Sequence, residues 1–459
     1  MHWAHNDHMS DAIQHRPSEQ PMQSGGWSYG LMGMPLAFVA LPLYVHAPHY
    51  YAQTLGVSLA SLGAALLIAR ALDAITDPWL GRITDRWFDQ SPNKVLRRMW
   101  WGVFALLLGV LALWFPPQPM LEWGATWLTA SITLTSLGYS QLTIAHQAWG
   151  SRISHTPVQR SRTMAWREGW ALVGVVSASV MPSLLDWAAW SFAFAALILV
   201  GMWAWYRSAA NSVWSFGPPV SHDDQASTPS DLSQRSLTEV AFASMPWRDQ
   251  DFRRLMGVFV ISGMASALPA TLVLFFIDQV LQLPDWTGGF LALYFASAAI
   301  GMPLWPRAVK RWGLERSWAL GMLLAVLSFA SASTLGAGDA SLYALICVGS
   351  GMALGADLAI PSALLAGLAR RGSDQEQSGI YFGWWNLATK LNLALAAGLG
   401  LPLLATWGYS PQTPSEEGLE ALIMAYGVLP CLLKLTALAL LKYWLWPTQA
   451  YNTQRRTKP

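Results

Sequence analysis

Three charged residues stand close together beside an apolar part of the chain. Arg70, Asp73 and Asp77 follow an uncharged apolar run, Val57 to Ile68, whose pattern is helical. Positions i, i+3 and i+7 share one face of an α-helix, which places the two carboxylates about one turn apart. In a membrane helix this face must turn towards a cavity or towards partners, because a charge at the bilayer centre costs about 2.5–3.5 kcal/mol.

Two closely spaced carboxylates can share a monovalent cation or hold a proton, and we favour this interpretation of Asp73 and Asp77. Pro78 supports it, because proline has no amide hydrogen and therefore leaves the carbonyl of Ala74 free as a further oxygen ligand. The alternative is an internal salt bridge between the aspartates and Arg70, with no ion bound.

The composition indicates a membrane protein and excludes a soluble enzyme. Of the 459 residues, 53% are hydrophobic and 12% are charged, whereas soluble proteins have about 25% charged residues. The net charge of +2 is spread along the chain, so we expect no nucleic-acid partner. No P-loop, zinc-ligand cluster or nucleophile elbow occurs, so we expect no cofactor and disfavour an ATP-driven pump. The two cysteines, Cys347 and Cys431, fall in apolar runs and predict no disulfide framework.

Twelve runs are long enough to cross a bilayer, which takes about 20 residues each. They lie near 27–51, 57–81, 98–115, 121–149, 164–186, 189–206, 254–280, 286–306, 317–335, 340–368, 379–406 and 420–446. The runs at 27–51 and 340–368 are rich in Gly and Pro, so we expect kinks there. The predicted organisation is a tail (1–24), a six-helix half (25–210), a polar linker (211–250), a second six-helix half (251–446) and a second tail (447–459).

Lysine and arginine occur in every second loop between these runs. The alternate loops at 52–56, 115–121, 281–287, 336–340 and 408–418 contain neither residue. Basic loops remain on the cytoplasmic side of a membrane, so both termini are predicted to be cytoplasmic. Two six-helix halves joined by a linker are typical of a secondary transporter with a central cavity between the halves.

A few more ionisable residues fall inside or at the ends of the runs. Lys390 is flanked by Asn386 and Asn392, and its amine needs a carboxylate or a polar ligand, so we expect it to pair with Asp73 and Asp77. Arg167 is adjacent to Glu168; it either donates bidentate hydrogen bonds to a solute or forms a plain contact with that glutamate. Asp357 is expected to face the cavity rather than a helix gate, and the sequence offers no explanation for Lys434.

These residues resemble the glycoside-pentoside-hexuronide:cation symporters, the melibiose-permease branch of the major facilitator superfamily. Residues 70–78 resemble the second-helix signature of that family, and residues 81–86 resemble the loop motif of the superfamily between helices two and three. The similarity continues in order through both halves, at 160–168, 293–295, 303–305, 310–313, 356–361 and 386–390.

The resemblance implies an all-α fold of twelve transmembrane helices in two six-helix halves, and it also implies roles for individual residues. Asp73 and Asp77 would bind the coupling cation, and Lys390 would lie in the cavity. Arg167 and Asn386 would approach the solute. The gating loop would contain Gly81, Asp85 and Arg86.

The sequence departs from the melibiose-type pattern in two helices. The first run has no acidic residue between Tyr29 and His46, and Ala37 stands roughly where that pattern has a sugar-binding aspartate. The fourth run lacks the third carboxylate of the cation site; His146 and Gln147 are the polar groups nearby, and we expect His146 to face the cavity. Galactoside specificity is therefore not expected to carry over, and protons are favoured over sodium.

The sequence thus predicts a symporter of the bacterial inner membrane, acting as a monomer by alternating access. It would move a sugar, a glycoside or a similar polar solute together with H⁺ or Na⁺, and its partners would be that solute, the cation and membrane lipid. The alternative is a proton-coupled exporter or translocase of an amphipathic, lipid-like solute, which the abundant Trp and Met would suit.

Overall fold

The chain folds into helices throughout the part that the structure describes. The computed structural model describes residues 26–47, 50–51, 59–118, 123–211, 245–370, 377–407, 409 and 415–446. Every regular element in these ranges is helical. Large apolar side chains lie on the outside, among them Trp101, Phe192 and Ile300, each more than 70% exposed. A surface of this kind suits contact with lipid rather than water.

The N-terminal half is built from α1 (Gly26–Gly30), α2 (Gly33–Leu41), η1 (Pro42–His46), α4 (Leu59–Gln90), α5 (Pro92–Trp114), α6 (Gly124–Arg152), α7 (Pro157–Leu184) and α8 (Trp187–Asn211). The first span is interrupted, as expected, since it consists of α1, α2 and the π-helical turn η1. Pro42 begins that turn, because a proline cannot donate the next hydrogen bond of the α-helical ladder.

The C-terminal half is built from α10 (Met245–Arg248), α11 (Gln250–Phe275), η3 (Phe276–Val280), η4 (Pro284–Trp286), α12 (Thr287–Gly301), α13 (Leu304–Trp312), α14 (Leu314–Ala330), η5 (Ser331–Thr334), α15 (Ala340–Leu368), α16 (Ser378–Thr406), α17 (Glu416–Ile423), η6 (Met424–Val428) and α18 (Leu429–Trp444). The kink expected at 340–368 does not break the element, since α15 continues through Pro361. Joining consecutive pieces gives six spans in each half.

Six helices in the described residues are long and apolar enough by themselves to cross a membrane. A seventh is obtained if the bent pair Pro284–Gly301 and Leu304–Trp312, which meet at 46°, is one span. The remaining long helices, α4, α6, α7 and α16, all contact the other half. Some of the polar side chains of these helices, such as Asp73, Asp77 and Lys390, lie where the two halves face each other.

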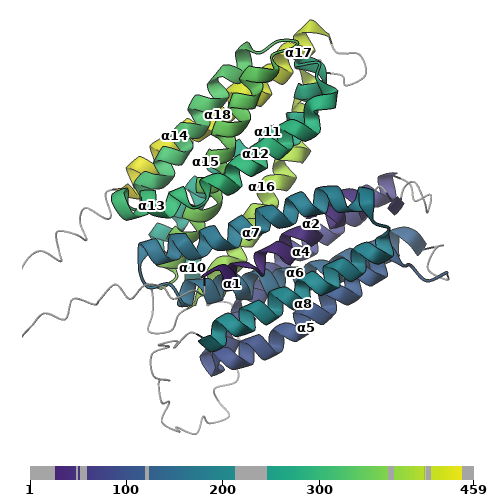
Figure 1. Ribbon diagram of the computed structural model, residues 1–459, viewed down its shortest axis with the longest axis vertical. Coiled ribbons are helices and arrows are strands. Elements are labelled where there is room, and N and C mark those ends of the chain that lie inside the picture. Colours follow the sequence, from purple (N-terminus) through teal and green to yellow (C-terminus); the bar gives the residue numbers. More distant parts are fainter. Residues whose placement is uncertain are drawn as a thin grey trace, which may run out of the picture.

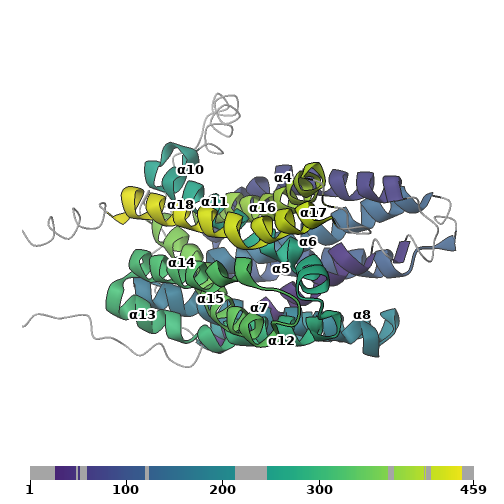
Figure 2. The same ribbon diagram turned by 90° about the horizontal axis from the view of Figure 1, so that it is seen from above.

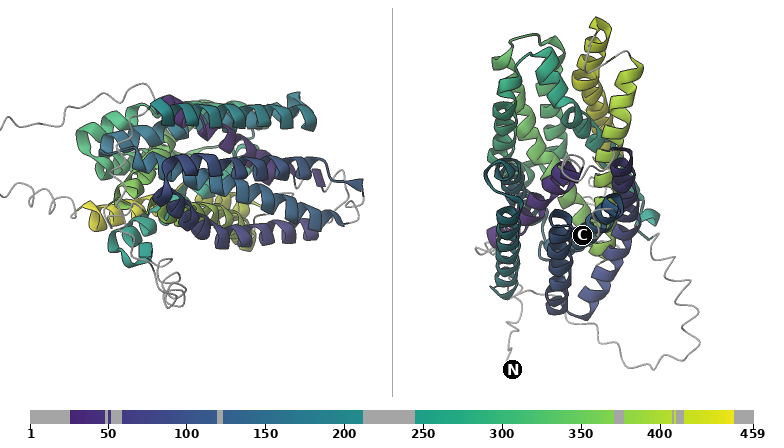
Figure 3. Two further views of the ribbon diagram at one scale, coloured as in Figure 1. Left: turned by 90° about the horizontal axis from the view of Figure 1, so that it is seen from below. Right: turned by 90° about the vertical axis from the view of Figure 1, so that its right-hand side faces the viewer.

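The two halves meet at one end and separate towards the other (Figure 1). The main contacts between them join α4 to α16, α6 to α16 and α7 to α15. We call the joined end the basic end, because Arg86, Arg152, Arg311 and Arg370 stand at the ends of their helices there. We call the other end, where α17 lies, the open end. Three further views show the same two bundles from above (Figure 2) and from below and from the side (Figure 3).

Candidate ion and solute site between the halves

Lys390 of α16 reaches across to the aspartate pair of α4. Its Nζ lies 2.8 Å from Asp77 Oδ2 and 3.2 Å from Asp73 Oδ2. It also donates a hydrogen bond to Ser140 Oγ of α6, at 2.9 Å. The pairing expected from the sequence is therefore present, and it joins three helices from both halves.

These charges are shielded from solvent and are not balanced. Asp77 is 0% exposed and Asp73 is 2% exposed, while the Lys390 side chain is 13% exposed. Two carboxylates face one ammonium group, which leaves one negative charge in excess among the described side chains when both acids are ionised. Buried charge without compensation is costly, so such a cluster favours a further cation or a proton.

Small residues let the two helices approach closely enough for this contact. A Cβ atom on Gly383 of α16 would lie only 2.6 Å from the carbonyl oxygen of Asp77. Nearer the basic end, a Cβ on Gly81 would lie 2.4 Å from the carbonyl oxygen of Gly379. Neither position has room for a side chain, so α4 and α16 touch backbone to backbone along this crossing.

Asn386 lies one turn before Lys390 on α16, and it faces α6, the helix that carries Ser140. Asn386 Nδ2 donates to Gln147 Oε1 of α6 at 3.0 Å. Residues four apart lie on one face of a helix, so Asn386 and Lys390 form a polar row along α16. Gln147 is the residue that stands near the place of the absent third carboxylate, and the structure brings it to Asn386 rather than to Asp77.

At the basic end, Asp85 joins the halves through the first residues of α16. Its Oδ1 accepts from Gly379 N at 2.7 Å, and its Oδ2 accepts from Ile380 N at 2.8 Å. The first amides of a helix have no partner within the helix and carry partial positive charge, so a carboxylate is well placed there. Of the other two predicted gating residues, Gly81 supplies the close approach described above and Arg86 is exposed.

Two arginines complete this contact and were not assigned from the sequence. Arg152 Nη2 donates to Asp85 Oδ1 at 3.0 Å, and its Nη1 donates to Ser378 Oγ at 2.5 Å. Arg370 Nη1 donates to the carbonyl oxygen of Ser154 at 2.9 Å. Both residues belong to predicted basic loops, which identify a side of the membrane but do not indicate which arginine meets which partner.

Other predicted site residues lie elsewhere. The side chain of Arg70 lies outside the described residues. Arg167 of α7 is 9% exposed and pairs with the adjacent Glu168, which is the plain contact considered above. The backbone of Arg167 packs against Gly33 of α2, inside the N-terminal half. The structure therefore does not bring Arg167 to Asn386.

The expected place of His146 at the cavity is wrong. His146 is 0% exposed, stacks on Tyr29 with ring centroids 4.1 Å apart and meets Trp205 edge-on. Its Nε2 lies 2.9 Å from the carbonyl oxygen of Tyr29. An imidazole ring can pack as an aromatic group, so this polar residue belongs to the core of the N-terminal half.

Asp357 also lies away from the space between the halves. Its Oδ2 is 2.5 Å from Nζ of Lys434, and its Oδ1 accepts from Trp318 Nε1 at 3.0 Å. All three residues belong to the C-terminal half, on α15, α18 and α14. This pair explains Lys434 and corrects the expectation that Asp357 faces the central cavity.

Comparisons with known proteins agree with this architecture. A family model described as MFS/sugar transport protein matches residues 22–445. The inner membrane symporter YicJ of Escherichia coli (strain K12) is 24% identical over 320 residues, which are 66% of this chain and 65% of that protein, just under two thirds of its length. A Salmonella typhimurium (strain LT2) protein, named provisionally as a 2,3-dihydroxypropane-1-sulfonate exporter, is 24% identical over 84% of each chain.

A solved structure shows the same fold. The crystal structure of a bacterial homologue of the iron transporter ferroportin, in an outward-facing state, aligns with a TM-score of 0.66. The alignment covers 91% of this chain and 99% of that one at 17% identity. The family match spans both halves, and the twelve helical spans are arranged as that fold requires. This chain is therefore an integral membrane transport protein of the major facilitator superfamily, and it belongs to the branch of the glycoside-pentoside-hexuronide:cation symporters.

Proposed function

We propose that this protein couples the movement of H⁺ or Na⁺ to the uptake of a sugar, a glycoside or a similar polar solute. The observation that carries the proposal is the ion cluster shared between the halves, in which Lys390 bridges Asp73 and Asp77. A cation bound by the two carboxylates replaces the ammonium group. Ion occupancy thereby changes the contact that holds α4 against α16.

The same exchange links the ion to the solute. When a cation neutralises the aspartates, Lys390 is released towards Asn386 of the same polar row and towards Gln147 and Ser140 of α6. Amine, amide and hydroxyl groups match the hydroxyls of a sugar. Each ligand then favours the binding of the other, as thermodynamic linkage requires.

We propose that the basic end faces the cytoplasm of a bacterial cell and that the membrane is the inner one. The positive-inside rule supports this orientation, because the loops at that end carry the Lys and Arg residues. The structure is then closed towards the cytoplasm by Asp85, Arg152 and Arg370 and open towards the outside. Alternating access proceeds by breaking these contacts and closing the open end.

The energy available from one coupling ion is sufficient. Moving one charge across about 150 mV supplies about 3.5 kcal/mol. This corresponds to accumulation of a few hundred-fold, since each 1.4 kcal/mol is a factor of ten. Without a titratable or ion-binding pair the carrier can only equilibrate its solute.

Asp77→Asn tests the proposal directly. The variant keeps the size of the side chain but carries no charge, so we expect accumulation to be lost while downhill exchange persists. Purified protein in liposomes is given a sodium gradient or a pH gradient, and uptake of methyl glucuronide, methyl xyloside and methyl galactoside is followed. Asp285→Asn, an exposed carboxylate at the open end, is the control and should accumulate normally. Full accumulation by Asp77→Asn contradicts the proposal.

Export is the second candidate, because one relative that matches 84% of the chain is named as an exporter. The same liposomes distinguish the two directions. In an exporter the solute and the protons cross the membrane in opposite directions, whereas in a symporter they cross in the same direction. A solute that moves only in the direction opposite to the proton flow therefore identifies an exporter. An amphipathic, lipid-like solute in place of the sugars tests the remaining alternative.

A further inference from the structure

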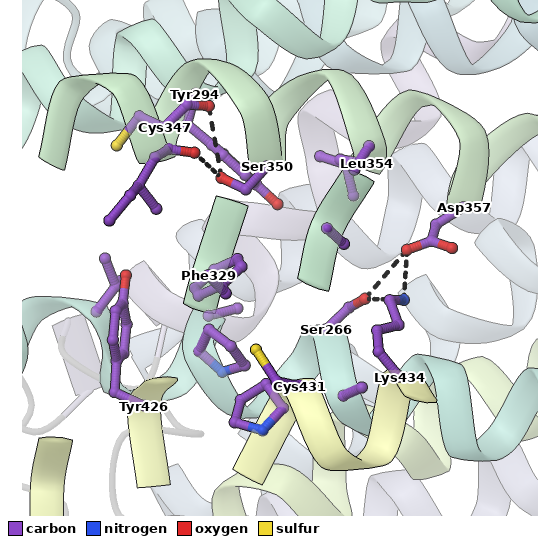
Figure 4. Close-up of a pocket in the computed structure, with 18 of the residues that line it drawn as sticks. Ser266, Tyr294, Phe329, Cys347, Ser350, Leu354, Asp357, Tyr426, Cys431 and Lys434 are labelled. Carbon is purple, nitrogen blue, oxygen red and sulfur yellow. Dashed lines mark hydrogen bonds and ion pairs between the residues drawn. The ribbon is translucent and has the colours of Figure 1, made fainter. Parts of the chain in front are cut away.

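A separate cavity lies inside the C-terminal half, away from the cluster of Lys390 (Figure 4). Its volume is about 160 Å³, and all of its lining residues come from the stretch between Ala265 and Lys434. The helices around it are α11, α12, α14, α15 and α18 together with η6. For comparison, an engineered apolar cavity of about 150 Å³ binds benzene. The cavity is therefore large enough for a single ring or a short chain.

Aromatic side chains form much of the cavity wall. They are Phe290, Tyr294, Phe295, Phe329, Tyr343 and Tyr426. The hydroxyls of Tyr343 and Tyr426 are 2.8 Å apart and one donates a hydrogen bond to the other, so the two polar groups lie against each other and the rings present apolar surface. A wall of this kind favours an apolar body in the ligand.

The charges at one end of the cavity cancel each other. Lys434 pairs with Asp357, and its Nζ also donates to Ser262 Oγ at 2.8 Å and to Ser266 Oγ at 2.9 Å. Asp357 accepts in turn from Trp318 Nε1. Because the two charges neutralise each other, a charged ligand would find no counter-charge in this mainly apolar cavity, and burying its charge there would be costly. The cavity thus favours an uncharged ligand.

The wall also contains a hydroxyl that bonds to no other described residue. The hydroxyl of Tyr294 has no hydrogen-bond partner among the residues that the structure describes. Tyr294 is partly buried and lines the cavity, so its hydroxyl can donate a hydrogen bond to an acceptor oxygen of a ligand held against the apolar wall. This hydroxyl would fix the orientation of a ligand, as the few polar groups of small-molecule sites commonly do.

We propose that this cavity binds a small uncharged molecule, the size of one ring or a short chain, with one oxygen that accepts a hydrogen bond from Tyr294. The site is distinct from the ion and solute site, because it lies within one half and shares none of the residues of the Lys390 cluster. The ligand contacts five helices of the C-terminal half at once, so its binding makes that half more rigid.

The two cysteines of the chain are built-in reporters, since Cys347 and Cys431 both line the cavity. Purified full-length protein in lipid nanodiscs is treated with methyl methanethiosulfonate, a small uncharged thiol reagent, and the rate is measured by intact mass. The probes are acetophenone, ethylbenzene and benzoate, which differ in the acceptor oxygen and in charge. At four times its dissociation constant, acetophenone slows modification about fivefold. Ethylbenzene protects less, and benzoate does not protect.

Matched variants separate the cavity from its hydrogen bond. Tyr294→Phe retains the ring, so the advantage of acetophenone over ethylbenzene falls by about two- to tenfold, the worth of one hydrogen bond. Ala325→Leu fills the cavity and removes protection by both probes. Leu345→Phe changes a side chain of α15 that is 66% exposed, so it leaves protection unchanged. If Ala325→Leu does not fold, Tyr294→Phe alone decides the assignment.

Three results would overturn the proposal. The first is that the cysteines do not react with the uncharged reagent at all, which means that small molecules cannot enter. The second is that acetophenone and benzoate protect equally, which means that the effect is not selective. The third is that Tyr294→Phe retains the full preference for acetophenone, which removes the assigned hydrogen bond. None of these results depends on transport, so they are independent of the proposed symport.

Discussion

The two lysines buried in the membrane region have opposite surroundings. Lys390 faces two carboxylates from the other half, whereas Lys434 faces one carboxylate within its own half. The first cluster has one negative charge in excess among the described side chains. The second is balanced and is surrounded by Trp318, Ser262 and Ser266. A charge cluster that takes part in coupled transport is expected to lie between the two halves and to be incomplete. Among the described side chains, only the first cluster has both features.

The largest effect on stability is expected at the balanced pair. Lys434→Ala leaves Asp357 buried without its counter-charge, and breaking such a pair costs about 3–5 kcal/mol. Thermal unfolding of the purified protein measures the loss. The double variant Lys434→Leu with Asp357→Leu removes both charges and should recover most of the stability. If Lys434→Ala is as stable as the wild type, the structural role of this pair is refuted.

A smaller steric effect is expected where the unbalanced cluster is assembled. Gly383→Ala places a Cβ 2.6 Å from the carbonyl oxygen of Asp77, so α16 must move away from α4, at a cost of about 1–3 kcal/mol. Transport should fall strongly, because Lys390 is displaced from the aspartates. Gly288→Ala is the control, since a Cβ there meets nothing within 4 Å. Equal transport by the two variants would show that the close approach is not required.

The smallest effect is expected in the polar row next to the cluster. Asn386→Ala removes the hydrogen bond to Gln147, which is worth about 1 kcal/mol. If Asn386 makes a hydrogen bond of similar strength to the solute, the apparent KM for solute should rise about fivefold, while thermal stability changes little. Ion dependence should remain, because Asp73, Asp77 and Lys390 are intact. A loss of ion dependence without a change in KM would place Asn386 in the ion site instead.

The partners of Lys390 could be predicted from the sequence, whereas the partner of Lys434 could not, and the reason is physical. A lysine in the middle of a membrane run needs a partner, and the face of Asp73 and Asp77 was the strongest candidate for Lys390. Asp357 was assigned to the central cavity, so no partner remained for Lys434, and nothing in the spacing of α14, α15 and α18 revealed that they converge. The helical spans could be predicted because each is a local run of apolar residues.

The place of His146 and the partner of Asp85 could not be predicted from the local sequence. His146 was expected at the cavity because it is polar, yet a neutral ring between Tyr29 and Trp205 packs like any aromatic side chain. The contact between Asp85 and Arg152 depends on which of many loop arginines reaches the other helices. That choice is made by the packing of the two halves and is not encoded in any short segment.

The most direct test of the central account is the cation affinity of Lys390→Met. If Lys390 and the coupling ion compete for Asp73 and Asp77, removing the ammonium group should strengthen cation binding by about tenfold or more, since an ion pair of 1.4 kcal/mol corresponds to a factor of ten. Accumulation of solute should be lost at the same time. Binding is measured as thermal stabilisation of the purified protein over a range of sodium concentrations and pH values. Unchanged or weaker cation binding in Lys390→Met contradicts the account.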